Sequence, residues 1–252
     1  MVGRTARGGP PPLDGAPGTV EDTAEQVTAR GGTGLAVQAD LTRPEQVSAL
    51  FERVHAERGR LDVLANAVWG GNERYRDLVW DSPFWEQPAD AWDQTMVAGP
   101  YAYLLASREA ARLMSRQGTG LIVHLTDGVM ADGSRPYSGQ IVWDLAHTSI
   151  ERMALGMGID LKPYRVAVVA LMPGFMRTER VLMYLPTAEL KQAAGFERTE
   201  TPEYLGRAVA ALASDPGVLA KTGRLHFVAD LAREYGFTDV DGTQPPRFSA
   251  FS

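Results

Sequence analysis

Two side chains in the segment WDLAH are spaced so that both can project from the same face of one helix. Trp143 and His147 are four residues apart, and residues at i and i+4 lie one above the other on a helix. The imidazole can exchange protons near neutral pH, whereas the indole N–H donates a hydrogen bond but cannot act as an acid or base. His147 is therefore the titratable member of this pair.

A carboxylate and a phenol precede this helix and could add to its chemistry. Asp127 follows the apolar run LIVHL, and an Asp127–His147 dyad, with the carboxylate orienting the imidazole, would act as a general base. Tyr137, in the loop between them, could swing its phenol towards Trp143. The pattern favours the structural alternatives, namely a turn aspartate, a loop tyrosine and a satisfied buried histidine.

The elements that must position these residues form an alternating pattern. Short, nearly continuous apolar runs alternate with helical stretches, which indicates a parallel sheet covered on both faces. We therefore predict an α/β fold, a Rossmann-like doubly wound parallel sheet in three α/β/α layers. The expected strands are residues 35–38, 61–68, 121–125, 166–171 and 225–228, and the expected helices are residues 21–29, 43–59, 89–114, 142–161 and 202–213.

Local signals mark some boundaries of these elements. Thr42, followed by Glu45 at the third helical position, predicts an N-cap with a capping box. Residues 1–19 are rich in Gly and Pro, so we expect a flexible leader there and a single domain over residues 20–252.

Composition excludes several classes of protein. The chain has 252 residues, 44% of them hydrophobic, a net charge of −6 and no cysteine. Disulfide frameworks, thiolate metal sites and a catalytic cysteine are excluded, and no apolar run is long enough to span a membrane. No secretory signal or metal-ligand spacing is present, and the acidic charge argues against nucleic acid. We expect a cytoplasmic protein with a small-molecule substrate, no nucleic-acid or membrane partner and no metal.

Ligands of an open α/β sheet bind beyond the carboxyl ends of its strands. In this chain those positions are residues 39–40, 66–71, 126–127 and 173–178. All four segments are short and polar or contain glycine, and they should converge at one edge of the sheet.

The order and spacing of these segments resemble the short-chain dehydrogenase/reductase (SDR) family from about Ala39 to the last strand. The resemblance implies that Asp40 contacts the adenine amino group of the cofactor. It implies that Asn66 and Ala67, followed by Gly70–Gly71, match the Asn-Ala-Gly element that props the central strand and lines the cofactor groove.

The same resemblance extends to the nicotinamide and ribose ends of the cofactor. Pro173, Gly174 and Thr178 match the turn that grips the nicotinamide carboxamide. Gly3 and Arg4 resemble the end of the second strand, where an arginine pairs with the 2′-phosphate of NADP(H). On composition alone, Arg4 is a solvated residue of the leader.

Two departures from the family put activity in doubt. The chain begins near the second strand, so the fold should lack the first strand–helix unit, whose glycine-rich turn cradles the diphosphate. NADP(H) binding should then be weak or lost. The family's Asn, Ser, Tyr and Lys positions fall on Gly99, Asp127 (or Thr126), Trp143 and His147.

Three functions follow from these observations. The first is an NADP(H)-dependent carbonyl or alcohol oxidoreductase whose missing unit is encoded upstream of Met1. The second is a non-redox lyase, isomerase or cyclase that uses Asp127 and His147. The third is a non-catalytic relative that binds a ligand or partner. The family also implies a homodimer or homotetramer, packed through the helices at residues 89–114 and 142–161.

Two further features remain open at this stage. Four tryptophans could line an apolar substrate pocket or form a capping subcore: Trp69, Trp80, Trp85 and Trp92. A sheet without its first strand would also leave a gap beside residues 35–38. Such a gap should be filled, because unpaired buried backbone groups are costly. We predict that residues 35–38 pair with residues 61–68, or that residues 1–5 fill part of the gap.

Overall fold

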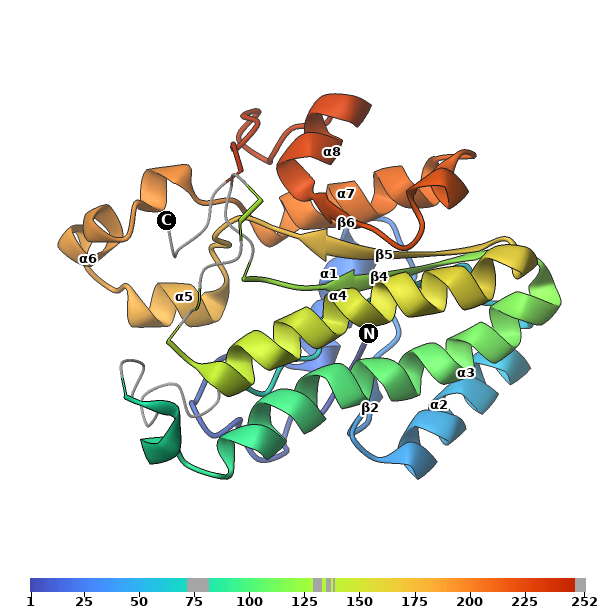
Figure 1. The fold of residues 1–252 in the computed structure, drawn as a ribbon, viewed down its shortest axis with the longest axis horizontal. Helices are drawn as coiled ribbons and strands as arrows, with labels where there is room; N and C mark the ends of the chain where they lie inside the picture. Colours follow the sequence, from blue (N-terminus) through green and yellow to red (C-terminus); the bar gives the residue numbers. More distant parts are fainter. Residues whose placement is uncertain (72–81, 129–132, 135–136, 138, 248–252) are drawn as a thin grey trace.

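A parallel sheet of four strands forms the centre of the molecule. The computed structural model describes residues 1–71, 82–128, 133–134, 137 and 139–247. The strands are hydrogen-bonded in the order β3-β4-β5-β6, and β5 is buried along its whole length. Helices cover both faces, which confirms the three-layer α/β fold (Figure 1). The strands are β3 (Val63–Asn66), β4 (Gly120–Leu125), β5 (Val166–Met172) and β6 (Leu225–Phe227).

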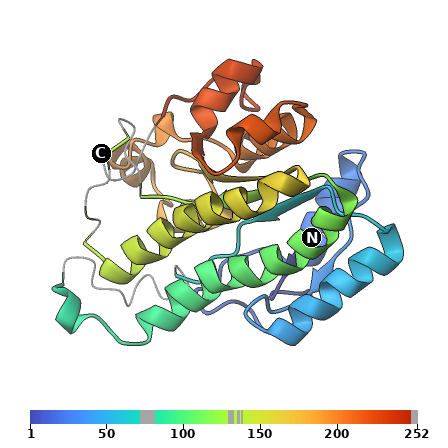
Figure 2. The same ribbon diagram turned by 45° about the vertical axis from the view of Figure 1, so that its right-hand side comes forward.

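The two faces of the sheet carry separate apolar cores. Figure 2 shows three helices side by side on one face, α2 (Pro44–Arg58), α3 (Ala102–Gln117) and α4 (Ile141–Leu161). On the other face α7 (Pro202–Ser214) and α8 (Val228–Tyr235) pack over β4 and β5. Because both faces are covered, the sheet fixes the positions of the residues that follow its strands.

The expected capping box at Thr42 is wrong. The hydroxyl of Thr42 donates to Oδ1 of Asp40 (2.7 Å), and Arg43 occupies the N-cap position of α2 without a side-chain cap bond. Helix α2 begins instead at Pro44, whose ring fixes φ near the helical value and whose missing N–H is not needed in the first turn.

The single helix expected over residues 89–114 is two segments. A π-helical segment, η2 (Asp93–Tyr101), precedes α3, and Ala98 inside this segment has non-helical angles (φ −85°, ψ 25°). Pro100 lies inside η2 and has no N–H to donate. The carbonyl oxygen of Ala98 accepts from the main-chain N–H of Gly70 (3.0 Å), so the kink joins this segment to the loop after β3.

The N-terminal residues form a second, smaller sheet. β1 (Val2–Gly3) pairs in parallel with β2 (Val37–Gln38), and α1 (Val20–Ala29) connects them. Residues 1–5 thus fill part of the gap, as predicted, and no pairing between β2 and β3 is present among the described residues. Two further residues of the leader form ion pairs with helices, Arg7 with Asp22 of α1 (2.6 Å) and Asp14 with Arg180 of α5 (Glu179–Tyr184).

The outer edge of β3 has no strand beside it in the part of the chain that the structure describes. The carbonyl of Asp62 accepts from Leu121 of β4, so by alternation Val63 and Ala65 direct their main-chain groups away from β4. Ala65 is also exposed. The two sheets are therefore not joined by hydrogen bonds.

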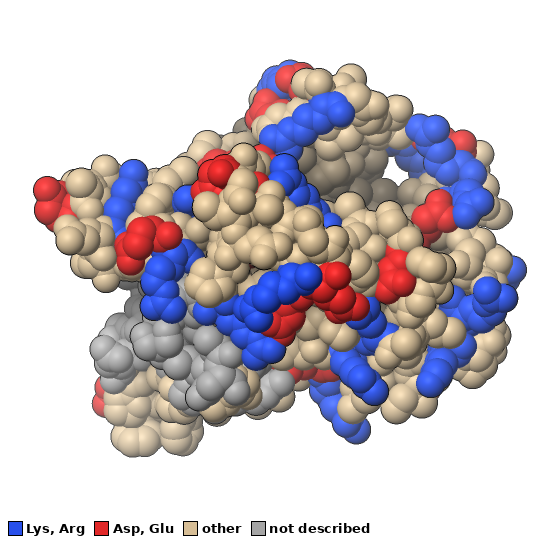
Figure 3. All heavy atoms as spheres, turned by 90° about the horizontal axis from the view of Figure 1, so that it is seen from above, with Lys and Arg blue, Asp and Glu red and all other residues tan. Residues whose placement is uncertain are grey.

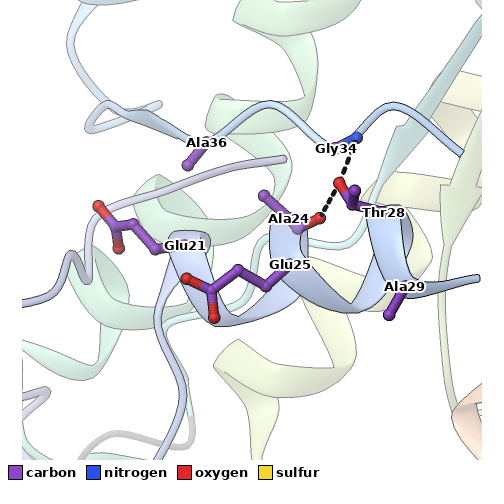
Figure 4. Close-up of a pocket in the computed structure, with 7 residues that line it drawn as sticks. All are labelled: Glu21, Ala24, Glu25, Thr28, Ala29, Gly34 and Ala36. Atoms are coloured by element: carbon purple, nitrogen blue, oxygen red, sulfur yellow. Dashed lines mark hydrogen bonds between the residues drawn. The ribbon is translucent and has the colours of Figure 1, made fainter.

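A close approach of α1 to the following loop requires glycine at position 34. A Cβ atom there would lie 1.9 Å from the carbonyl oxygen of Ala24. The hydroxyl of Thr28 accepts from the N–H of Gly34 (3.2 Å) and donates to Ala24 (3.0 Å), as Figure 4 shows. A surface pocket of about 540 Å³ lies here, with Glu21 and Glu25 at its border.

Two short helices follow β5 and were not expected from the sequence. They are α5 (Glu179–Tyr184) and α6 (Ala188–Ala193), and the hydroxyls of Thr178 and Thr187 cap their N-termini. Neither is long enough to show a clear apolar period, so the pattern could not reveal them.

The distribution of surface charge and the apolar character of the helices bear on binding to nucleic acid and to membranes. Basic and acidic side chains are interspersed on the face shown in Figure 3, without a large area of one sign. Within the described ranges, no helix combines the length and the apolar character that crossing a membrane requires.

Candidate active site

The residues after β4 contact α4 through hydrogen bonds between main-chain and side-chain groups. The N–H of Asp127 donates to Nδ1 of His147 (3.0 Å), and the hydroxyl of Thr126 donates to the carbonyl oxygen of His147 (3.2 Å). The carboxylate of Asp127 instead accepts from the N–H of Gly128 (2.7 Å). The contact between Asp127 and His147 is therefore present, but it involves the peptide group and not the carboxylate of the expected dyad.

His147 lies between two indole rings. Its ring centroid is 4.4 Å from that of Trp69 and 4.2 Å from that of Trp143. Burial among these rings lowers the pKa of His147 to about 3, so the imidazole is neutral at pH 7. Because Nδ1 accepts the Asp127 N–H, the ring proton belongs on Nε2. A neutral imidazole held in this way cannot supply the positive charge of the family's lysine.

Glycines make room for Trp69. A Cβ atom at Gly71 would lie 2.8 Å from the Trp69 ring, and one at Gly99 would lie 2.9 Å from it. The residue at the family's asparagine position is thus small because an indole fills the space beside it. We call Trp69, Trp143 and His147 the aromatic stack.

Asp127 is the titratable group at this edge that remains partly exposed. Its side chain is half-buried at the carboxyl end of β4, and burial raises the pKa of its carboxyl group to about 6. The carboxyl group therefore changes charge just below neutral pH, in the range that suits a general acid or base.

Asn66 is fully engaged inside the protein. Its Nδ2 donates to the hydroxyl of Ser107 (3.1 Å), which in turn lies 3.1 Å from Nε2 of the buried His124. Burial lowers the pKa of His124 to about 4, so this ring is also neutral. This chain of polar groups connects β3 to α3 and β4, and the following residue, Ala67, is exposed.

The residues expected at the adenine end lie on the smaller sheet. Oδ1 of Asp40 accepts from the N–H of Thr42 (2.9 Å), and the carbonyl oxygen of exposed Arg4 accepts from Gln38 (2.9 Å). The glycines at residues 31–34 follow the end of α1, so they present no helix N-terminus to a phosphate.

The turn after β5 is partly exposed and rests on a buried acid. The hydroxyl of Thr178 accepts from the N–H of Val181 (3.2 Å), and the carbonyl oxygen of the buried Glu200 accepts from the N–H of Arg177 (2.8 Å). Pro173 begins this turn directly after β5. The sequence pattern gave no sign of Glu200, because an acid shortly before a helix is common at the surface.

The structure brings only some of the expected residues together. Asp127 and the aromatic stack share one site, whereas Tyr137 is 59% exposed. Trp85 (71% exposed) and Trp92 are also exposed, so of the described tryptophans of the expected wall only Trp69 reaches the stack. Trp80 lies outside the described residues.

Two surface pockets of the described chain lie away from this site. One is the pocket beside α1, and the other, of about 530 Å³, lies at the amino ends of β3 and β4 beside the end of α7. Neither is lined by Asp127 or the stack. The arrangement of the polar residues therefore defines the candidate site better than the hollows of the surface do.

Comparisons with known proteins agree with this geometry. The family model described as "Enoyl-(Acyl carrier protein) reductase" matches residues 15–230. Dehydrogenase/reductase SDR family member 1 of Mus musculus is 33% identical over 232 residues, which cover 89% of this chain and 72% of that protein.

Solved structures show the same fold. One from Xanthomonas campestris, described as a dehydrogenase, has a TM-score of 0.76 at 20% identity and covers 98% of this chain and 85% of its own. Acetoin dehydrogenase from Enterobacter cloacae has a TM-score of 0.64 at 26% identity and covers 82% of this chain and 78% of its own. With a matching family model, a relative that shares a third of its residues and the strand-end elements in place, the chain belongs to the short-chain dehydrogenase/reductase family of oxidoreductases.

Proposed function

We propose that the protein transfers hydride between NADP(H) and a small carbonyl or alcohol substrate, with Asp127 in the proton-transfer role. The observation that carries this proposal is the position and pKa of Asp127, a half-buried carboxyl group at the carboxyl end of β4 with a pKa of about 6. Membership of an oxidoreductase family supports the redox part.

The neighbouring groups are unsuited to proton transfer. Trp143 has no acid or base function near neutral pH, and Nδ1 of neutral His147 is occupied by the Asp127 N–H. Asp127 can donate a proton to the oxygen of a carbonyl that becomes an alcohol, and its carboxylate can accept a proton in the reverse direction. We expect slow turnover, because no charged lysine supports this step.

The residues present fit the nicotinamide and the 2′-phosphate of NADP(H) better than its diphosphate. The partly exposed turn at Gly174–Thr178 offers main-chain groups for the nicotinamide carboxamide, and exposed Arg4 offers a charge for the 2′-phosphate. The bound cofactor would supply or accept the hydride. The glycines at residues 31–34 form no phosphate cradle, so we expect affinity weaker than micromolar when NADPH fluorescence is titrated.

Replacing Asp127 with asparagine tests the proposal. The variant removes the proton but keeps the shape of the side chain, so kcat should fall by about a hundredfold or more, and any inflection of kcat near pH 6 should disappear. A panel of carbonyl substrates with NADPH provides the measurement. Asp160→Asn is the control, because that carboxylate is exposed near the far end of α4. Full activity in Asp127→Asn would contradict the proposal.

The absence of a cradle at residues 31–34 also favours a second candidate, a non-redox lyase, isomerase or cyclase in which Asp127 moves a proton without NADP(H). Turnover that needs no nicotinamide and is lost in Asp127→Asn would support it. Ligand binding without turnover by either route would identify the third candidate, a non-catalytic relative.

We also propose a cytoplasmic homodimer or homotetramer that packs through α3 and α4. Apolar side chains on one exposed face support this, including Leu145 and Ile159 (65% exposed) on α4 and Leu104 on α3. A Cβ atom at Gly156 would meet open space, which permits close approach of another helix.

Charges on this face should break the assembly. Ile159→Asp is expected to convert the oligomer to a 27 kDa monomer in light scattering, because a carboxylate would be buried without a partner. Leu190→Asp on α6 is the control, since that leucine is exposed on another part of the surface. A monomeric wild type at high concentration would refute the assembly.

A further inference from the structure

A buried acidic pair lies beneath the turn after β5. We propose that Glu200 is a positioning residue that holds the turn at residues 173–178 closed while its carboxyl group carries a proton, and that releases the turn when it ionises. The inference rests on the proposed function only in taking this turn as the nicotinamide contact.

Two main-chain hydrogen bonds connect Glu200 to the turn. Its N–H donates to the carbonyl oxygen of Phe175 (3.0 Å), and its own carbonyl accepts from the N–H of Arg177 (2.8 Å). The main chain of Glu200 therefore anchors the turn, and the side chain of the same residue is buried.

The surroundings of this carboxyl group disfavour its charge. Glu200 is 1% exposed, and its Oε1 has no hydrogen-bond partner among the described residues. Burial raises the pKa of Glu200 to about 7, although the Gly174 N–H and the charge of Arg177 act in the opposite direction. Burying Glu200 in its protonated, neutral form costs less free energy than burying a carboxylate whose Oε1 has no hydrogen-bond partner among the described residues.

The neighbouring acid explains why the proton belongs on Glu200. Asp239 accepts from the N–H and the hydroxyl of Thr201 and from the N–H of Val240 (2.7 Å), and it pairs with Arg177 at 3.4 Å. These donors surround the carboxylate of Asp239, and its negative charge disfavours a second negative charge on Glu200. Tyr204 of α7 also faces the pair and stays neutral, because burial and both carboxylates raise its pKa to about 12.

Opening of the turn would let water reach Glu200. The carboxyl group would then ionise near its ordinary pKa of 4.5, whereas in the closed state it ionises near 7. The closed state thus binds the proton more tightly, and the closing equilibrium should weaken by about a hundredfold between pH 4.5 and pH 7, then stay constant.

Amide hydrogen exchange of the ligand-free protein tests this. Protection of residues 174–177, corrected for the intrinsic pH dependence of exchange, should fall by about a hundredfold in the wild type from pH 4.5 to pH 7. In Glu200→Gln, which keeps the size of the side chain but cannot ionise, the protection should stay high at every pH. Glu197→Gln, at an exposed acid three residues earlier, should behave like the wild type.

The hydrogen-exchange results can either support or overturn the proposed role of Glu200. A wild-type turn with constant corrected protection overturns the inference whatever the variants do, and so does an equal fall in Glu200→Gln. NADPH titration of the same samples separates the two proposals. Loss of protection without any NADPH binding would leave the role of Glu200 intact and count against the nicotinamide contact.

Discussion

Replacing Glu200 with glutamine is expected to raise the free energy of unfolding by about 3 kcal/mol at pH 8 and to leave it unchanged at pH 4. The folded pKa of Glu200 is raised from 4.5 to about 7, so the folded state binds the proton more tightly than the unfolded chain. Wild-type stability from this group is fully present below pH 4.5 and is lost as the pH rises to about 7. Glutamine cannot ionise, so the variant avoids this loss.

Urea unfolding at intervals from pH 4 to pH 8 provides the measurement. The difference between Glu200→Gln and the wild type should grow from zero to its full value across the window from pH 4.5 to pH 7. Glu197→Gln should show no such trend, because its carboxylate is exposed. A difference that is the same at all pH values would show that Glu200 is ionised, or equally protonated, in both states.

For the aromatic stack we expect the wild-type free energy of unfolding to fall as the pH falls, which is the opposite of the trend expected for Glu200. His147→Gln should be less stable than the wild type by about 2 kcal/mol at pH 7, because the packing of the ring against two indoles is lost. That difference should change by about 3 kcal/mol between pH 6.5 and pH 4, so that it passes through zero at about pH 5 and the variant is the more stable protein at pH 4.

The sign follows from the lowered pKa of His147, from 6.5 to about 3. Below pH 6.5 the unfolded wild-type chain binds a proton that the folded protein does not, so wild-type stability falls as the pH falls, and the glutamine variant has no such group. His55→Gln is the matched control, because that histidine is exposed on α2. Parallel stability curves for His147→Gln and the wild type would mean that His147 is charged in the folded protein.

The layers of the fold could be predicted from local pattern. The apolar run of β5 and the helical period of α4 agree with the structure within one residue at each end. Both signals lie within a single element, where burial on two faces or on one stripe determines the sequence directly. The kink at Ala98 was missed, because it depends on a hydrogen bond from Gly70, far away in the sequence.

The local sequence pattern could locate the candidate site, but it could not predict which groups of the site contact one another. The strand-end rule brought Asp127 and His147 together, but whether the carboxylate or the peptide N–H faces the ring depends on the fold. Trp69 reached the stack because Gly99 leaves space for it, a relation between residues 30 positions apart. Glu200 and Asp239 come together only through the loops after β5 and α8, and no periodicity connects them.

The division between the two sheets has a consequence for cooperativity. The pair β1–β2 has no backbone hydrogen bonds to β3 in the described chain and is joined to the larger sheet through side chains, such as those of α2 against α3 and the Arg30–Glu203 ion pair. Main-chain ladders make a sheet melt as one unit, and side-chain contacts alone transmit less of that coupling. The β1–β2 sheet should therefore unfold at a lower denaturant concentration than the four-stranded sheet. A single two-state unfolding transition would then describe the four-stranded sheet alone.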